Sequence, residues 1–193
     1  MTNLTDRFSR AVEYAREQHA ADTRKGTSIP YLSHLLGVAS IALDYGANED
    51  QAIAALLHDV VEDHGGLEAL REIEDRFGPE VARIVLACSD STEENKPDWQ
   101  ERKKKYVAAI SHKQADELLV SAADKVHNAR AILADYREVG DKLWGRFRTA
   151  SAEDQLRYYR SLANAFISRR EQVGPIAAEL DRVVTELELE VRG

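Results

Sequence analysis

The sequence contains a single cysteine, Cys88, which excludes an internal disulfide and any cysteine-rich metal site. It also has no uninterrupted apolar run of about 18 residues, the length that a membrane-spanning helix needs. The residues from Met1 to Asp6 lack the basic patch and apolar run of a secretory signal. We therefore expect a soluble protein of the reducing cytoplasm that has no membrane partner.

Basic residues are in the minority, with 26 Lys and Arg against 34 Asp and Glu, a formal net charge of −8 and an isoelectric point near 5.3. Proteins that bind nucleic acid through its phosphate backbone need a positive surface. This composition therefore argues against a nucleic-acid partner and favours a small-molecule ligand.

Helix-breaking residues are also scarce, with four prolines and ten glycines among 193 residues. Hydrophobic residues make up 44% of the chain, enough to bury a sizeable core, and the length suits one domain. The alternation typical of strands is absent almost everywhere. We therefore expect a single all-α domain over residues 1–193.

Apolar spacing divides the chain into helical segments. Thr5 is predicted to cap the first helix, Asn48 with Gln51 resembles a capping pair before the third, and the stretch from Ser89 to Pro97 is predicted to be a loop. The predicted helices cover about residues 5–20, 31–45, 52–61, 67–77, 79–89, 98–111, 116–137 and 151–191, the last interrupted at Gly174-Pro175.

Four polar residues interrupt otherwise apolar helices: His34, His58, Asp59 and Asp124. Burial of an imidazole or a carboxylate without a partner costs several kcal/mol. One divalent cation would satisfy all four, because neutral imidazoles and ionised carboxylates are suitable ligands. Each residue alone also has a simpler explanation: His34 could touch solvent at a helix start, and Asp124 could be an N-cap or one half of a salt bridge.

The end of the third predicted helix carries an unusual density of such groups. His58 lies four residues before Glu62, and Asp59 four residues before Asp63, so both pairs project from one helix. Three carboxylates within one turn at a helix C-terminus cost about 1 kcal/mol or more unless a cation is present. We therefore predict that His58 and Asp59 bind the metal, while Glu62 and Asp63 hold and deprotonate a water molecule.

The set His34, His58-Asp59 and Asp124 resembles the H…HD…D signature of the HD-domain metal-dependent phosphohydrolases. A longer series of sequence positions, spread over about residues 5–165, resembles the hydrolase domain of RelA/SpoT proteins and the stand-alone small alarmone hydrolases. It comprises Arg24-Lys25, Pro30-Tyr31, His34, residues 54–63, Phe77-Gly78 and residues 123–130.

This resemblance implies an all-helical HD fold in which His34, His58, Asp59 and Asp124 hold a single ion, commonly Mn²⁺. It also implies that Glu62 and Asp63 serve the attacking water. The implied activity is removal of pyrophosphate from the 3′ position of guanosine tetraphosphate or pentaphosphate (ppGpp hydrolase). Since only a helical extension of about residues 151–191 remains, the resemblance implies a stand-alone hydrolase without a synthetase domain.

The resemblance also suggests substrate contacts. Arg24 and Lys25 resemble residues that pack on the base in this family, although an ordinary charged loop would look the same. Asn128 and Arg130 resemble nucleotide- and phosphate-contacting positions, but only Asn128 shares a helix stripe with Asp124. Lys125 could offset charge on the substrate.

This sequence departs from the family pattern in the Gly26-Thr27-Ser28-Ile29 connection and at Leu35, which follows the metal histidine. These departures leave the ion site intact and fall where guanine would be recognised, so a 5′-nucleotidase or another nucleotide phosphomonoesterase is the alternative. A non-catalytic nucleotide sensor is a third hypothesis. Oligomeric state stays open, and a homo-oligomer is compatible with the apolar late helices.

Several other residues are expected at the surface or in packing contacts rather than as ligands. These are the histidines His19, His64, His112 and His127, which are expected at the surface or between helices, and the pair Tyr158-Tyr159, which is expected in the core or at an interface.

Overall fold

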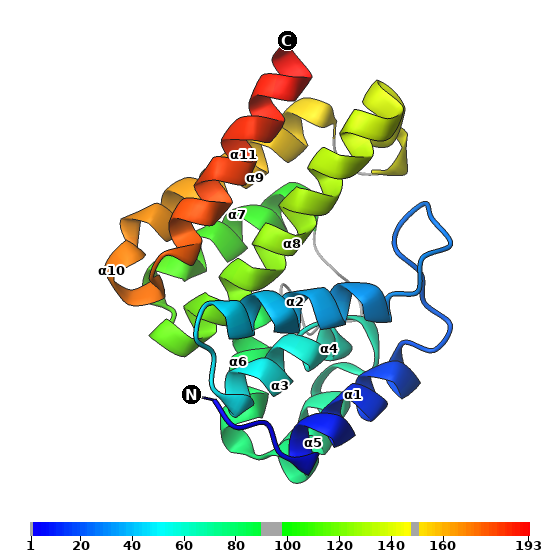
Figure 1. Ribbon diagram of the computed structural model, residues 1–193, viewed down its shortest axis with the longest axis vertical. Coiled ribbons are helices and arrows are strands. Elements are labelled where there is room, and N and C mark those ends of the chain that lie inside the picture. The colour runs from blue at the N-terminus through cyan, green and yellow to red at the C-terminus, as the bar shows by residue number, and fades with distance from the viewer. Residues whose placement is uncertain (1, 90–97, 148–150) are drawn as a thin grey trace.

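The computed structural model describes residues 2–89, 98–147 and 151–193, and these fold into helices joined by short connections (Figure 1). Within these ranges the extended pairing is limited to one isolated bridge between Thr23 and Pro30. The predicted all-α class is confirmed. Most of the predicted loop from Ser89 to Pro97 lies outside the described residues. In the described parts of the chain, no helix combines the length and apolar character needed to cross a membrane.

The elements follow the predicted order. The α-helices are α1 (Asp6–Gln18), α2 (Leu32–Asp44), α3 (Glu49–Leu57), α4 (Val60–Asp63), α5 (Gly66–Phe77), α6 (Pro79–Cys88), α7 (Trp99–Ala109), α8 (Ala115–Val139), α9 (Ala152–Ser168), α10 (Arg170–Val173) and α11 (Ile176–Arg192). Two 3₁₀ segments, Ile110–His112 and Gly140–Arg146, were not predicted.

Local capping explains where the early helices begin and end. The Thr5 side chain accepts a hydrogen bond from the backbone of Arg7, and Asn48 with Gln51 forms a complete capping box. After α2 the chain turns at Gly46, whose φ of 88° is a left-handed conformation that glycine adopts without strain. The predicted caps at Thr5 and Asn48 are therefore confirmed.

The third helix differs from the prediction because it is interrupted. It was predicted to run through 52–61, but α3 ends at Leu57 and α4 begins at Val60. The His58 ring donates a hydrogen bond to the Ala55 carbonyl at 2.8 Å. Side-chain bonds of this kind compete with the regular backbone pairing of a helix. His58 and Asp59 therefore lie in the turn between two helices.

Helix α8 is the central element of the fold. It packs against α2, α3 and α6 and also against α9, α10 and α11 (Figure 1). Its apolar side chains, including Leu118, Val126 and Leu133, belong to one continuous buried cluster that also contains Phe166 and Leu180 of the late helices. The late helices therefore share a core with the rest of the chain.

This shared core predicts that α11 contributes to global stability. Leu180 is fully buried, so Leu180→Ala should lower the free energy of unfolding by about 2–5 kcal/mol in a single urea transition. Leu189 on the same helix is 70% exposed, and Leu189→Ala should change the free energy of unfolding by less than about 0.5 kcal/mol. A separate early transition for the late helices would contradict the single domain that we expect over residues 1–193.

Candidate active site

Four polar side chains from three parts of the fold meet at one buried point. His34 lies in the first turn of α2, His58 and Asp59 in the turn between α3 and α4, and Asp124 in the middle of α8. Nε2 of His34 lies 3.5 Å from an Asp59 carboxylate oxygen and 3.3 Å from one of Asp124. Nε2 of His58 lies 3.1 and 3.5 Å from the same two oxygens. The structure thus brings the four predicted ligands together.

The His34 and His58 rings make their contacts through Nδ1, which leaves both Nε2 atoms available to bind a cation. The Ala55 carbonyl can only accept, so His58 donates from Nδ1, and its Nε2 faces the two carboxylates. Nδ1 of His34 lies 2.9 Å from Nδ1 of His127. Both Nε2 atoms are buried and have no hydrogen-bond partner among the described residues. Two imidazole nitrogens facing two carboxylates fit a divalent cation, which would take the place of protons at this point.

Electrostatics favour positive charge at this point. Burial disfavours a charged imidazole, yet Asp59 and Asp124 hold the pKa of His58 well above its usual value. Burial likewise opposes ionisation of Asp124, but the Lys125 ammonium and the two histidines hold its pKa well below the usual range. Burial opposes ionisation of Asp59 too, but His58 and His34 hold its pKa well below the usual range, so both carboxylates are ionised, as metal ligands must be.

Neighbouring side chains fix the two carboxylates. The Tyr31 hydroxyl donates to Asp59 at 2.5 Å. Lys125 Nζ donates to one oxygen of Asp124 at 2.6 Å, and the Asn128 amide donates to the other at 2.5 Å. The Lys125 ammonium also lies 4.5 Å from the centre of the Tyr106 ring. These contacts hold the carboxylates in place, as the outer groups around metal sites do.

A cavity of about 230 Å³ opens beside these residues. Asp59 and Asp124 line it together with Glu62 and Asp63, and Lys103 and Lys125 add positive charge. Glu62 is half-buried and its carboxylate lies 3.6 Å from the Arg102 guanidinium, whereas Asp63 is exposed. The two acids predicted to handle water therefore share a cavity with the candidate ligands.

A second pocket, of about 450 Å³, adjoins the first, and Tyr31 and Asn128 line both. The Arg24 guanidinium donates to Asn128 at 2.8 Å and lies 5.8 Å from the Tyr31 ring centre. The Lys25 ammonium lies 5.4 Å from the centre of the Phe147 ring. Three of the proposed substrate contacts, Arg24, Lys25 and Asn128, therefore line one pocket.

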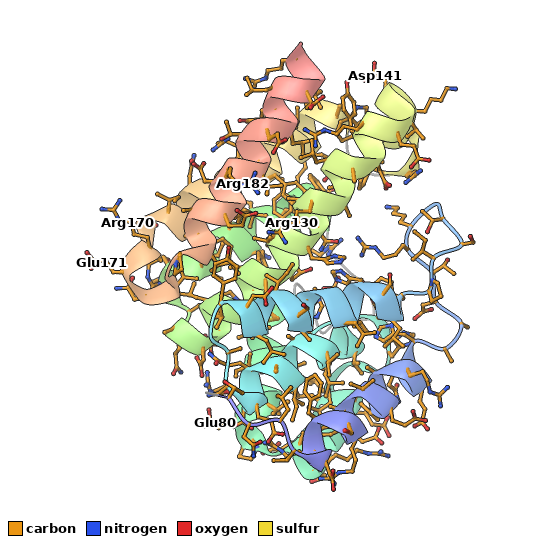
Figure 2. All side chains as sticks on the ribbon, in the orientation of Figure 1. Glu80, Arg130, Asp141, Arg170, Glu171 and Arg182 are labelled. Atoms are coloured by element: carbon orange, nitrogen blue, oxygen red, sulfur yellow. The ribbon has the colours of Figure 1, made fainter. Side chains whose placement is uncertain are left out.

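Arg130 lies elsewhere. Its guanidinium donates to Glu179 of α11 at 2.7 Å, and its side chain is 46% exposed (Figure 2). The structure does not bring Arg130 to either pocket. Six residues separate it from Asp124 on α8, which turns it to another face of the helix. Of the tyrosine pair expected in packing, Tyr159 is buried and lines the second pocket, while Tyr158 lies against Trp99.

Sequence reasoning missed the role of His127, which was expected at the surface or in packing. It is half-buried, and its ring contacts His34 on the side opposite Asp59. Burial lowers the pKa of His127 to about 4, with His34 and Arg24 acting in the same direction, so the ring is neutral at pH 7. The one signal in the sequence was its spacing, because residue 127 is one helical turn after Asp124.

Gly37 leaves the space that the His127 ring occupies. A Cβ atom at Gly37 would lie 2.3 Å from Nε2 of His127. Gly37→Ala should therefore displace the ring, lower the free energy of unfolding by about 1–3 kcal/mol and weaken metal binding about 10- to 100-fold. Urea unfolding and metal titration test this. Gly145→Ala, which meets nothing within 4 Å, should change neither quantity.

The sequence and the fold were compared with those of known proteins. Residues 11–165 match the family described as HD domain. The guanosine-3′,5′-bis(diphosphate) 3′-pyrophosphohydrolase MESH1 of Xenopus tropicalis is 38% identical over 123 residues, which cover 62% of this chain and 66% of that protein. The GTP pyrophosphokinase rsh of Brucella ovis is 34% identical over 129 residues, 65% of this chain but only 17% of its own length. A solved structure of a metazoan ortholog of SpoT, described as hydrolysing ppGpp, has a TM-score of 0.76 at 23% identity and covers 96% of this chain and 98% of its own. That structure shows the fold alone.

Proposed function

Because the chain belongs to the HD domain family, we propose that it is a metal-dependent hydrolase that removes pyrophosphate from the 3′ position of guanosine tetraphosphate. One observation carries the proposal: two buried imidazole nitrogens without hydrogen-bond partners among the described residues face the carboxylates of Asp59 and Asp124. The chemistry named for the Xenopus relative supplies the substrate class.

His34, His58, Asp59 and Asp124 would hold the ion, for which we propose Mn²⁺. A divalent ion bound there would polarise a phosphoryl oxygen and lower the pKa of a bound water molecule toward about 7. Two imidazole nitrogens and two carboxylates do not by themselves select the metal, because Fe²⁺, Co²⁺ and Zn²⁺ accept the same donor set. Availability in the cell then decides which ion is bound.

Glu62 and Asp63 orient the attacking water and take its proton as its oxygen attacks the 3′-linked phosphorus. The bond between that phosphorus and the ribose 3′ oxygen breaks, pyrophosphate leaves, and the ribose oxygen recovers a proton. Since both carboxylates line the cavity that Asp124 and Lys125 also line, they lie within the space where this transfer takes place.

The adjoining pocket would receive the guanosine. Arg24 presents a planar guanidinium beside Tyr31, and a purine can stack on such a surface. The Asn128 amide links this pocket to the metal cluster, since it contacts both Arg24 and Asp124. Lys125 contributes positive charge next to the phosphate groups of the substrate.

The direct experiment incubates the protein with guanosine tetraphosphate and Mn²⁺ and identifies the products by phosphorus NMR. We expect GDP and pyrophosphate in equal amounts, and no reaction after chelation of the metal. Release of inorganic phosphate from nucleoside monophosphates, with guanosine tetraphosphate left intact, would favour a 5′-nucleotidase. Tight binding of the tetraphosphate without any product would favour a nucleotide sensor.

A further inference from the structure

A second group of metal-binding side chains lies outside the site described above. Nδ1 of His19 lies 2.9 Å from a carboxylate oxygen of Asp22, and Nε2 of His64 lies 2.6 Å from the same oxygen. The two ring nitrogens are 3.2 Å apart. Sequence analysis expected both histidines at the surface or in packing, and the structure brings three donor atoms from two segments of the chain to one point.

The backbone around these residues is held in place. His19 ends α1, and its carbonyl accepts a hydrogen bond from the Asp22 backbone. The Asp22 carbonyl in turn accepts one from Tyr31, so Asp22 lies at the base of a closed loop. His64 ends α4 and donates its backbone N–H to Val60. The three side chains are therefore brought together by backbone that is fixed independently of them.

Burial leaves one side of the group open. The His19 side chain is fully buried, whereas those of Asp22 and His64 are 37% and 28% exposed. Nε2 of His19 is buried and has no hydrogen-bond partner among the described residues, so Nδ1 is the nitrogen of this ring that faces Asp22 and His64. Burial opposes ionisation of Asp22, but hydrogen bonds from His64 and His19 outweigh it and lower the pKa of the carboxyl. A cation would replace the protons that these atoms share, and water can reach the remaining positions.

The spacing of the three atoms is close to that of a metal site. Ligand atoms 2.0–2.1 Å from a tetrahedral zinc ion lie about 3.3 Å apart. The observed separations of 2.6, 2.9 and 3.2 Å are slightly shorter, so outward movements of under about 1 Å would admit the ion. The end of α1, where the helix dipole is negative, also favours a cation at this point.

We propose that His19, Asp22 and His64 form a second cation site, which binds one divalent transition-metal ion such as Zn²⁺ through two imidazole nitrogens and one carboxylate oxygen, with water in the open positions. Two histidines and one carboxylate with open positions are a common donor set for Zn²⁺ and Fe²⁺. This site is distinct from the first because it shares none of its four residues.

An ion in this site would join two segments that the proposed reaction uses. Asp22 lies two residues before Arg24, and His64 directly follows Asp63. Tyr31 connects the two sites, since its ring stacks on His19 at 5.0 Å and its hydroxyl bonds to Asp59. The ion would therefore hold the loop of the second pocket against the turn that carries the two acids. Its binding, however, can be measured whether or not the proposed function is correct.

The test counts zinc ions by elemental analysis after the metal-free full chain is equilibrated with Zn²⁺ buffered in the micromolar range. Wild type should bind two ions per chain. His64→Ala and Asp22→Asn, both at partly exposed positions, should each bind one. Asp124→Asn, which disables the first site, should also bind one, and the His64→Ala, Asp124→Asn double variant none. His112→Ala, a change at an exposed histidine, should still bind two.

A second readout does not depend on the ion count. In the Asp124→Asn background, Zn²⁺ should raise the unfolding temperature when His64 is present and should not raise it after His64→Ala. A single ion in wild type, or two ions retained by both His64→Ala and Asp22→Asn, would overturn the second site. Either result leaves the first site and its activity to be judged separately, by pyrophosphate release.

Discussion

Replacing Glu62 by Gln and Asp63 by Asn in one variant is expected to lower turnover of guanosine tetraphosphate by roughly two to four orders of magnitude, the usual scale of acid–base catalysis. Both amides keep nearly the shape of the acids but cannot take a proton from water. Neither residue belongs to the four-residue cluster, so metal content should stay near that of wild type. Steady-state kinetics and elemental analysis on the same preparation measure the two effects.

The matched control is Glu68→Gln with Asp75→Asn, which removes two exposed carboxylates from α5 and makes the same change in net charge. This variant should retain the wild-type turnover. If the Glu62 and Asp63 variant also retained it, the role assigned to these two acids would be wrong. A loss of turnover accompanied by a loss of metal would instead place one of them among the ligands.

Much of the helical framework was predictable because its signals are local. Thr5 and the Asn48-Gln51 pair cap helices through contacts within three residues, and these patterns are visible in the sequence. The interruption at His58 was not visible, because it depends on the direction that one ring takes toward the Ala55 carbonyl. The 3₁₀ segment Gly140–Arg146 likewise has no strong periodic pattern.

The same distinction applies to the site. On α8, Asn128 is turned by about 40° from Asp124 and Arg130 by about 240°, at 100° per residue. This simple geometry correctly favoured Asn128 as a neighbour of Asp124, and the structure directs Arg130 toward α11. Spacing along one helix is therefore informative about which side chains share a face, even without any knowledge of the tertiary fold.

Contacts between distant segments could not be predicted in this way. His127 contacts His34 across 93 positions in the sequence, and His64 contacts His19 across 45. These contacts depend on how α1, α2, α4 and α8 pack against one another, and no local pattern in the sequence specifies that packing. A lone histidine on a helix is more often a packing residue than a ligand, so the sequence placed His127 in packing without naming His34 as its partner, and it did not reveal the group around Asp22.

Asp124→Asn is expected to have the largest effect of all, because it removes one of two negative charges from the candidate cluster and leaves the Lys125 ammonium without its carboxylate. The loss of an ionic ligand should release the first ion. Since this ion is expected to supply several kcal/mol of transition-state stabilisation, turnover should fall by more than about a thousandfold. Pyrophosphate release measures the activity, and titration with Mn²⁺ measures the binding.

Asp116→Asn is the matched control, because it makes the same substitution in the first turn of α8, where Asp116 pairs with Arg83 far from the cluster. It should keep both turnover and Mn²⁺ binding. If Asp124→Asn bound Mn²⁺ as tightly as this control, the orphaned nitrogens of His34 and His58 would need another explanation, such as a shared proton. Saturating Mn²⁺ that restored turnover in Asp124→Asn would instead indicate that the carboxylate contributes affinity alone, since three ligands would then suffice for the reaction.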